Sequence, residues 1–295
     1  MEASEHEATM VGKVVVITGG NAGIGKETAV ALAGSGARVL FTSRDPGRGE
    51  AALAEIRERS GSNEVEVVAL DLASLASVRA CADEIRRRCS QIDVLINNAG
   101  LILSERSESE DGIEMTLAVN HFGPFALTLQ LLDRVRASEG GRIVNVSSDA
   151  HRMVRAFDFD DLHSRQSYGG MKAYSQSKLA NVLFTRELAA RVDGFGITVN
   201  TLHPGLVRSR FARDGDARGW LGAVFAVATR FVALSPEAGA RTSVYLASSP
   251  EVQSTSGEYF VRCRSRRPNA AARDSAAARR LWELSERLSG QCIEL

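Results

Sequence analysis

The chain contains a series of short apolar segments that lack alternating polar positions. The first is Val14-Val-Val-Ile17, which runs into Thr18 and two glycines. An apolar run without alternation is typical of a strand buried on both faces, as in a parallel sheet covered by helices. A sequence of helical composition separates each run from the next, so the pattern predicts a doubly wound α/β fold. The later segments are 38–42, 65–70, 92–96, 142–146 and 197–202.

The C-terminal part completes this plan. Residues 257–261 predict a final edge strand, and residues 270–289 predict a helix outside the main sheet. We therefore expect a Rossmann-like sheet of about seven strands with helices on both faces. The chain has 295 residues and no evident linker, which fits one domain better than two. The predicted organisation is a flexible polar tail at 1–12, one catalytic domain at 13–262 and a C-terminal extension with a helix at 263–295.

The overall composition argues against several classes of function. Lys plus Arg and Asp plus Glu balance at 36 each, so no overall field favours nucleic acid or a charged membrane surface. The first ten residues are polar and predict neither a signal peptide nor a membrane anchor. Four cysteines without close metal-ligand spacing predict no metal site and a reducing, cytoplasmic location. These cysteines are Cys81, Cys89, Cys263 and Cys292.

A glycine-rich loop lies between the first predicted strand and the first predicted helix. Gly19, Gly23 and Gly25 would let the backbone turn sharply and approach a pyrophosphate. The following helix would present its positive N-terminal end to the same group. A glycine-rich loop alone is often only a turn, but in this position it predicts a dinucleotide site, which Asn21 and Ile24 complete.

The end of the second predicted strand indicates which dinucleotide would bind. Arg44 lies 19 residues after Gly25, where an acidic residue would bind the ribose of NAD and an arginine would bind the 2′-phosphate of NADP. Asp45 is the rival, but Asp45 followed by Pro46 also fits a helix N-cap and first helical position. We therefore predict NADP(H) rather than NAD(H), with Ser43 and Arg44 in its site. The alternative for Arg44 is a solvated surface arginine.

Polar or small residues also follow the third and fourth predicted strands. Either segment alone would be an ordinary turn. Because the carboxyl ends of parallel strands share one edge of the sheet, where such folds bind ligands, we expect both segments to line the cofactor site. The predicted residues are Asp71, Leu72, Asn98, Ala99 and Gly100.

Asn120 interrupts an apolar stretch of helical character at residues 115–127. Asparagine is a poor interior helix residue, and Gly123 and Pro124 should distort the turn further. Two interpretations stay open. The amide satisfies the kink, or the distortion frees a backbone carbonyl that holds a water molecule.

Two tyrosine–lysine pairs have the spacing that places both side chains on one helix face. Tyr174 precedes Lys178 by four residues, and Tyr168 precedes Lys172 by the same interval. An ammonium beside a phenol favours the phenolate and lets the phenol exchange protons near neutral pH. Two glycines directly follow Tyr168 and disfavour a helix there, whereas Tyr174 begins a clean helical pattern. We therefore prefer Tyr174. Ser148, after the fifth strand, either caps a loop or acts beside that tyrosine.

Taken in order, these motifs resemble the short-chain dehydrogenase/reductase superfamily over roughly residues 13 to 262. The segments 175–188, 203–209 and 147–151 are most similar to its retinol dehydrogenase-like branch. The motifs are Gly19-x3-Gly23-x-Gly25, Asn97-Asn-Ala-Gly100, Asn120, Ser147-Ser148, Tyr174-x3-Lys178 and Pro204-Gly205.

The resemblance implies a role for each matching residue. Ser148 would polarise the substrate oxygen and Tyr174 would pass the proton. Lys178 would lower the pKa of the tyrosine and hold the nicotinamide ribose, while Asn120 would place a relay water. The segment that contains Pro204, Gly205 and Val207 would lie along the nicotinamide amide.

These observations predict an NADP(H)-dependent oxidoreductase acting on a small, lipophilic alcohol, aldehyde or ketone. The apolar segment 208–234 would face the substrate or, alternatively, simply pack on the sheet. A non-catalytic nucleotide sensor or scaffold on the same fold is the alternative function, because fold alone does not decide activity. An epimerase or dehydratase is disfavoured because no added substrate domain is evident. Membrane-bound members of the retinol dehydrogenase-like branch carry an apolar N-terminal anchor, so the polar tail of this chain predicts a soluble protein. A homo-oligomer is possible from the sequence.

Overall fold

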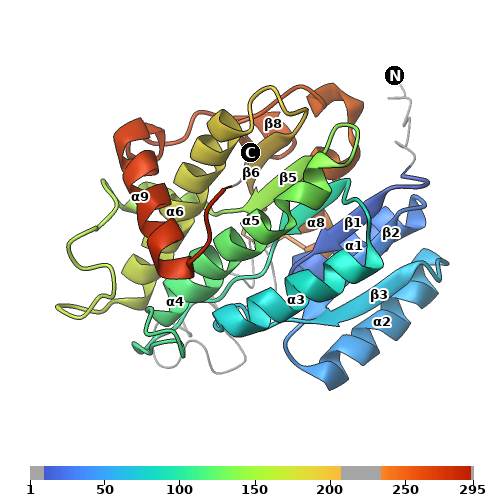
Figure 1. Cartoon of the computed structure of the whole chain (residues 1–295), viewed down its shortest axis with the longest axis horizontal. Coiled ribbons are helices and arrows are strands. Elements are labelled where there is room, and N and C mark those ends of the chain that lie inside the picture. Colours follow the sequence, from blue (N-terminus) through green and yellow to red (C-terminus); the bar gives the residue numbers. More distant parts are fainter. Residues whose placement is uncertain (1–9, 207–233, 294–295) are drawn as a thin grey trace.

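The computed structural model describes residues 10–206 and 234–293, which form one eight-stranded sheet in the order β3-β2-β1-β4-β5-β6-β7-β8 (Figure 1). Every neighbouring pair is parallel except β7 and β8. The doubly wound prediction is confirmed. The strands are β1 (Val14–Ile17), β2 (Arg38–Ser43), β3 (Val65–Ala69), β4 (Val94–Asn97), β5 (Arg142–Val146), β6 (Thr198–His203), β7 (Tyr259–Val261) and β8 (Arg264–Ser265).

The eighth strand is a short addition to the expected sheet of about seven. β8 has two residues and pairs antiparallel with β7 through a tight turn. Arg262 and Cys263 form that turn with φ of 52° and 59°, values that favour glycine or asparagine. A two-residue strand is too short to show an apolar pattern in the sequence. The turn before it contains arginine and cysteine, which do not indicate a turn.

The apolar runs form strands because both of their faces are covered. Val15, Val16 and Ile17 of β1 are fully buried, and Val15 aligns with Val39 of β2 and Val94 of β4. β1 therefore has the next strand in sequence on one side and a much later strand on the other. This is the switch point of the sheet, the place at which doubly wound folds bind their ligands.

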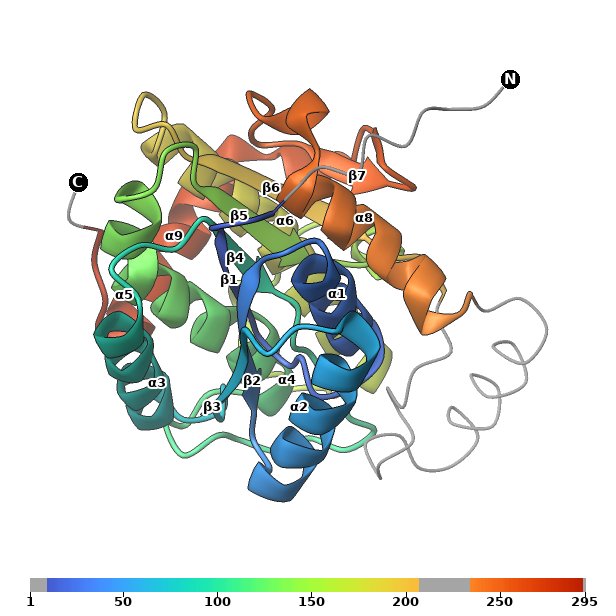
Figure 2. The same cartoon turned by 90° about the vertical axis from the view of Figure 1, so that its right-hand side faces the viewer.

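Two layers of helices enclose the sheet (Figure 2). Apolar residues of α1, α2 and α8 pack on one face, and those of α3, α5 and α6 pack on the other. The helices of the described residues are α1 (Gly23–Gly34), α2 (Pro46–Ser60), α3 (Leu75–Arg88), α4 (Met115–Leu117), α5 (Gly123–Arg136), α6 (Gly170–Arg191), α8 (Pro236–Ser248) and α9 (Ser275–Ser289).

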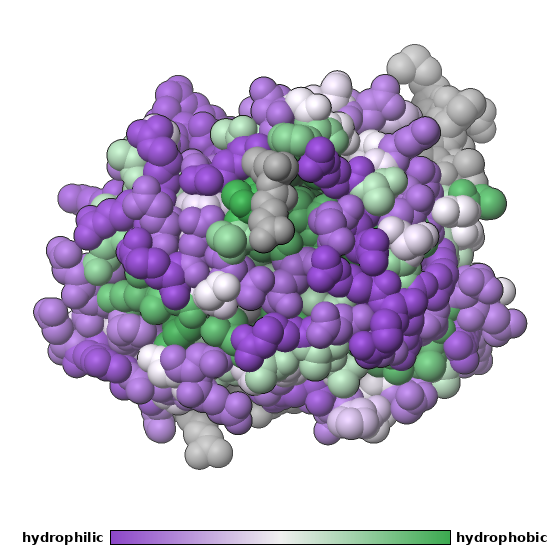
Figure 3. Space-filling view, in the orientation of Figure 1, coloured by the Kyte–Doolittle hydropathy of each residue, from purple (hydrophilic) through white to green (hydrophobic). Residues whose placement is uncertain are grey.

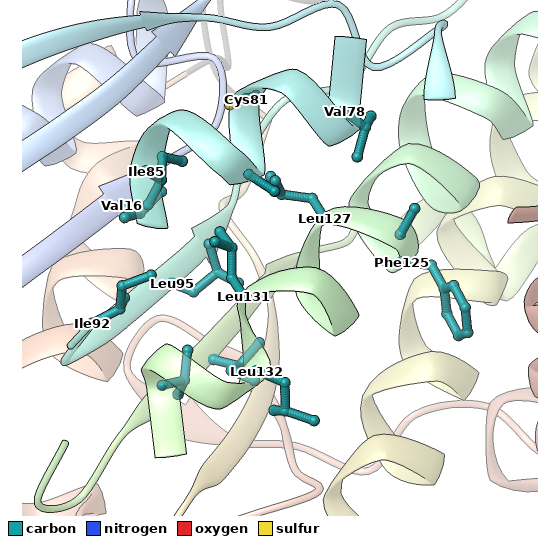
Figure 4. Close-up of a cluster of buried hydrophobic side chains, with 14 of the residues drawn as sticks. Val16, Val78, Cys81, Ile85, Ile92, Leu95, Phe125, Leu127, Leu131 and Leu132 are labelled. Atoms are coloured by element: carbon teal, nitrogen blue, oxygen red, sulfur yellow. The ribbon is translucent and has the colours of Figure 1, made fainter. Parts of the chain in front are cut away.

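Side chains of α3 and α5 meet over the strands in one of the buried clusters (Figure 4). Ile85 of α3, Leu131 of α5 and Leu95 of β4 are all fully buried. Burying each such side chain stabilises the fold by about 1.5–3 kcal/mol relative to leaving it exposed. This packing fixes the height of α5 above β4, and hence the position of the segment that leads into α5.

The start of α2 confirms the capping role predicted for Asp45. The Arg48 N–H donates to the Asp45 carboxylate at 2.7 Å, and Pro46 occupies the first turn. This bond satisfies one of the N–H groups that every helix start leaves without an internal partner.

The C-terminal helix packs on other helices. The predicted segment divides into a short turn at Ala271–Arg273 and α9, which Asp274 caps by accepting from Ala276 N and Ala277 N. α9 lies beside α6 and α5 (Figure 1). Its Trp282 is 2% exposed and meets the ring of Phe125 edge-on at 5.0 Å. The domain boundaries at residues 12 and 262 stay predictions.

The outer face of this helical layer is mostly hydrophilic, with apolar residues gathered in smaller patches (Figure 3). Of the helices in residues 10–206 and 234–293, none combines the length and apolar character needed to cross a bilayer.

His121 links the core to α9. Its ring is 1% exposed, and its Nε2 lies 2.9 Å from Ser285 Oγ. The Ser285 hydroxyl donates to the Leu281 carbonyl, so the histidine N–H is the donor in the contact between the two side chains. Burial lowers the pKa of His121 to about 3, with a hydrogen bond to Asn181 only partly opposing it.

We expect this histidine to make the fold acid-sensitive. In the unfolded chain His121 becomes protonated below about pH 6.5, whereas in the folded chain it stays neutral down to about pH 3. The free energy of unfolding therefore decreases as the pH falls from about 6.5 to 3. Urea unfolding should show the wild type losing about 2 kcal/mol more than His121→Leu between pH 7 and pH 4.5. Parallel pH dependences for the two proteins would contradict the neutral buried imidazole.

Candidate active site

The first part of the site is the loop that joins β1 to α1. Gly19 and Gly23 have φ of 66° and 54°, and a Cβ on Gly25 would lie 2.4 Å from Asn98 Nδ2 and 2.5 Å from the Gly19 carbonyl oxygen. The loop therefore needs glycine at each position. Among the described residues no side chain caps α1 at Ala22, so the first N–H groups of that helix are left to bind a ligand. The geometry fits a pyrophosphate.

Two threonines that the sequence analysis missed hold this loop. Thr18 Oγ1 accepts from Asn98 N at 2.9 Å and from Ala99 N at 3.1 Å, while Asn98 Nδ2 donates back to the Thr18 carbonyl at 2.9 Å. Thr42 Oγ1 accepts from Gly19 N at 3.2 Å. The predicted Asn98 and Ala99 thus contact the glycine loop directly. The signal was a threonine at the end of an apolar strand, beside the predicted loop.

The predicted residues at the end of β2 differ in exposure. Ser43 is buried, and its hydroxyl donates to the Asp45 carbonyl at 2.8 Å. Arg44 is exposed at the carboxyl edge of the sheet, while Asn21 and Ile24 are half-buried on the neighbouring loop. The structure therefore places a cation at the edge where an adenosine ribose would lie, and NADP recognition stays a prediction.

Asp71 and Leu72 have clear structural contacts after β3. Asp71 Oδ1 accepts from Ala73 N at 2.9 Å, which closes a tight turn into α3. A Cβ on Gly123 would lie 2.5 Å from the Leu72 carbonyl oxygen, so this segment presses on the start of α5. Their predicted part in cofactor binding is untested.

The expected distortion around Asn120 is a π-helix, Ala118–Phe122, inserted directly before α5. Its wider turn is closed by Gly123 N donating to the Ala118 carbonyl. Pro124 has no N–H to give to the Asn120 carbonyl four residues earlier, which explains why regular α-helical bonding fails here. Such π-turns are frequent at functional sites.

The Asn120 side chain connects three elements. Its Oδ1 accepts from Leu101 N at 2.8 Å, and its Nδ2 donates to the Leu101 carbonyl at 2.9 Å and to Ser177 Oγ at 2.9 Å. The Ser177 hydroxyl in turn donates to the Tyr174 carbonyl at 2.7 Å. The amide is thus satisfied by the segment after β4 and by α6, which leaves the water hypothesis for its backbone carbonyl untested.

Gly100 lies where the β4 segment, the π-helix and α6 converge. A Cβ on this residue would lie 3.2 Å from Asn120 Oδ1 and 3.3 Å from Lys178 Nζ. These distances are tighter than ordinary side-chain contacts, so the absence of a side chain lets the two groups approach the loop. The segment after β4, the π-helix and α6 therefore meet at this residue.

Lys178 and Tyr174 lie one turn apart on α6, and Ser148 faces them from the end of β5. Lys178 is 3% exposed, its Nζ donates to the Val146 carbonyl at 3.1 Å, and it lies 5.5 Å from the centre of the Tyr174 ring. The Ser148 side chain hydrogen-bonds with Tyr174. Ser147, the other candidate serine, is turned away and donates to the Lys178 carbonyl at 2.8 Å.

Burial governs the protonation of this pair. It raises the pKa of the Tyr174 phenol to about 12, against the opposing effect of Ser148, and lowers the pKa of the Lys178 ammonium to about 8. The lysine was expected to lower the pKa of the tyrosine, but desolvation is the larger effect here. Near pH 7 the phenol therefore keeps its proton. The lysine is protonated and positively charged, but it loses its proton more easily than an exposed lysine does.

Tyr168 has a separate structural role. Its hydroxyl donates to the Leu103 carbonyl at 3.0 Å, and Lys172 pairs with Asp158 at 3.1 Å. α6 begins at Gly170, so Tyr168 lies outside the helix, as predicted. Gly170 is nevertheless helical. A Cβ there would lie 2.0 Å from the Leu103 carbonyl oxygen, so only glycine allows this close approach.

The described part of the segment after β6 ends at Leu206. Pro204 follows the last residue of β6, and Gly205 has φ of 91°. Leu206 accepts from Leu234 N through its carbonyl at 2.7 Å. Val207 and most of the predicted substrate-side segment, residues 208–233, lie outside the described ranges.

Comparisons with known proteins identify the family of this chain. The family model for short chain dehydrogenases matches residues 13–218. Human retinol dehydrogenase 14 is 44% identical over 294 residues, which cover 95% of this chain and 87% of the relative. Human retinol dehydrogenase 12 is 45% identical over 279 residues, with the same coverage of 95% and 87%.

Solved structures agree. An uncharacterised protein from Mycobacterium paratuberculosis is 35% identical with a TM-score of 0.77, covering 98% of this chain and 97% of its own. RhlG from Pseudomonas aeruginosa, solved as an NADP active-site complex, is 26% identical with a TM-score of 0.68, covering 85% of this chain and 95% of its own.

The threonine brace gives a prediction about the glycine loop. Thr18→Val keeps the shape of the side chain but removes the acceptor of the Ala99 N–H and leaves the Asn98 N–H only its contact with the Ile96 carbonyl at 3.1 Å. A buried N–H that loses its acceptor costs about 1–3 kcal/mol. We expect a lower melting temperature and weaker NADPH binding by fluorescence titration. The matched control is Thr28→Val on α1, where the hydroxyl donates only to the Ile24 carbonyl of its own helix. Equal effects of the two variants would contradict a special role for Thr18.

Proposed function

The chain belongs to the short-chain dehydrogenase family, and we propose that it is an NADP(H)-dependent oxidoreductase of a small lipophilic alcohol, aldehyde or ketone. The observation that carries this proposal is the convergence of four side chains from three elements, the π-helix, the end of β5 and α6, close to Gly100. A nucleotide sensor would need the glycine loop but would not need this set. The four residues are Asn120, Ser148, Tyr174 and Lys178.

In this mechanism the glycine loop would hold the cofactor, whose nicotinamide would supply or take up the hydride at the substrate carbon, and side chains of the protein would exchange the proton. The substrate oxygen would lie between the hydroxyls of Ser148 and Tyr174, which are hydrogen-bonded to each other in this structure. Ser148 would donate to that oxygen and polarise it. Tyr174 would give its proton to the oxygen during reduction or receive it during oxidation, so that no full alkoxide charge develops unassisted.

Lys178 would assist this transfer through its charge and its easily lost proton. A phenol with a pKa of about 12 is a weak acid, so the negative charge left on Tyr174 needs stabilisation within the site. The Lys178 ammonium lies on the same helix face and supplies that charge. With a pKa of about 8 it also returns a proton to the tyrosine at modest cost.

The proposed substrate class rests on the relatives. Retinol dehydrogenases 12, 13 and 14 from human are 43–45% identical to this chain over at least 95% of its length. Their names point to a long, apolar alcohol. A retinoid or a similarly lipophilic aldehyde is therefore the first substrate to test, together with medium-chain and aromatic aldehydes and ketones.

We expect Tyr174→Phe to separate binding from chemistry. Removing the phenolic proton should lower kcat by about 10²–10⁴-fold, since this is the usual contribution of a general acid. The fold and NADPH affinity should stay nearly unchanged, because the ring remains in place. Turnover is followed by the absorbance of NADPH with a panel of aldehydes and ketones.

Tyr168→Phe is the matched control for that variant. It removes the bond to the Leu103 carbonyl and should change kcat by less than about fivefold, because a single neutral hydrogen bond contributes only about 1 kcal/mol. The reverse ranking of the two variants would overturn the assignment of Tyr174. NADPH binding without turnover of any substrate would favour the sensor.

Arg44 should determine the cofactor preference. If it binds the 2′-phosphate, Arg44→Ala should raise the KM for NADPH about tenfold or more and leave the KM for NADH nearly unchanged, since a hydrogen bond to a charged group contributes about 1.5–3 kcal/mol. Arg79→Ala on α3 is the control for removing an exposed arginine. A wild-type preference for NADH would contradict this role.

A further inference from the structure

Two histidines hold opposite ends of one peptide group beside the site. The Ser148 carbonyl oxygen lies 2.7 Å from His151 Nδ1. The N–H of Asp149 points at His203 Nδ1 at 3.3 Å. This carbonyl and this N–H belong to the same peptide bond, the one that follows Ser148. One histidine comes from the turn after β5 and the other from the last position of β6.

The chemistry of the peptide determines the tautomer of each ring. A carbonyl only accepts, so His151 must carry its proton on Nδ1. A backbone N–H only donates, so His203 must leave Nδ1 bare and carry its proton on Nε2. Asp149 Oδ2, 3.6 Å from His203 Nε2, favours a proton there. His151 Nε2 is buried and has no hydrogen-bond partner within the described part of the chain, as suits a nitrogen without a proton.

Neighbouring contacts hold both rings and the peptide in place. His151 is fully buried, edge-on to the ring of Tyr259 at 4.9 Å, and its carbonyl accepts from Asn269 Nδ2 at 3.2 Å. The Asp149 carboxylate accepts from the Tyr259 hydroxyl at 2.9 Å and from Arg152 Nε at 3.1 Å. The turn after β5, the end of β6 and the start of β7 thus meet around one peptide group.

We propose that His151 and His203 are positioning residues that clamp the Ser148–Asp149 peptide and so fix the direction of the Ser148 hydroxyl. The inference rests on the proposed function, in which Ser148 contacts the substrate oxygen. Ser148 is extended, with φ −156° and ψ 154°, and rotation about ψ would turn the following peptide out of both histidine contacts. Because His203 directly precedes Pro204, the clamp also joins the serine to the segment expected along the nicotinamide.

The clamp needs the His203 ring to be neutral. A second proton on His203 would replace the acceptor of the Asp149 N–H with a donor. Burial lowers the pKa of His203, and the charge of Asp149 opposes this effect. The charges of Arg152 and Arg262 lower the pKa further, so that it lies below its ordinary value. Burial likewise lowers the pKa of His151. The clamp is therefore intact at neutral pH.

The first test reads the tautomers without any assay of activity. Protein labelled with 15N-histidine is examined at pH 7.5 by long-range 1H–15N correlation, and His151→Asn and His203→Asn assign the two rings. We expect a bare Nε2 in His151 and a bare Nδ1 in His203. Identical tautomers, or averaging between tautomers at either ring, would overturn the clamp even if the enzyme is fully active.

The second test compares replacements that keep or remove the acceptor at position 203. His203→Leu should lower kcat about tenfold or more while the NADPH Kd changes less than about threefold, because a small misplacement of a reacting group is costly. His203→Asn, whose amide oxygen can take the place of Nδ1, should restore most of kcat. His163→Leu, outside the clamp, should retain activity.

Ser148→Ala separates failure of this inference from failure of the proposed function. An active Ser148→Ala enzyme would overturn the role of the serine itself. Two other results would overturn only the clamp, provided that Ser148→Ala is inactive. One is full activity of His203→Leu, and the other is a kcat of His203→Asn no higher than that of His203→Leu.

Discussion

The site depends first on the hydrogen bonds of one buried amide. Asn120 bonds both polar backbone groups of Leu101 and also Ser177, which itself holds the Tyr174 carbonyl. It can do so because the π-helix widens the turn before α5 and directs this side chain at the end of β4. The segment after β4 and the start of the catalytic helix are thereby held at a fixed separation, within which Gly100 leaves room for the Lys178 ammonium.

A second constraint is the cost of burying the reacting groups. Desolvation moves the pKa of the Tyr174 phenol up to about 12 and that of the Lys178 ammonium down to about 8. Both shifts favour the neutral forms. The same dry environment strengthens the electrostatic interactions that the site makes with any charge developing on the substrate oxygen. Ser148 is then the residue whose direction matters most, and neutral His151 and His203 hold its following peptide with protons on opposite ring nitrogens.

The sequence was sufficient for the features that depend on local chemistry. Unbroken apolar runs predicted the parallel sheet, Asp45 before Pro46 predicted a cap, and the glycines after Tyr168 placed that tyrosine outside the helix. It was insufficient where contacts join distant segments. The brace from Thr18 to Asn98 spans 80 residues and the contact from Asp149 to His203 spans 54, so neither leaves a local pattern. Binding roles such as that of Asp71 stay predictions.

We propose that this constellation moves a hydride and a proton between NADPH and a lipophilic carbonyl compound. The most direct measurement is transfer of deuterium from NADPH labelled at nicotinamide C4, using retinaldehyde as substrate and mass spectrometry of the product. The account predicts an alcohol with one deuterium on the former carbonyl carbon, formed by the wild type and greatly reduced with Tyr174→Phe. Product formed without the label, or labelled product formed equally by both proteins, would contradict it.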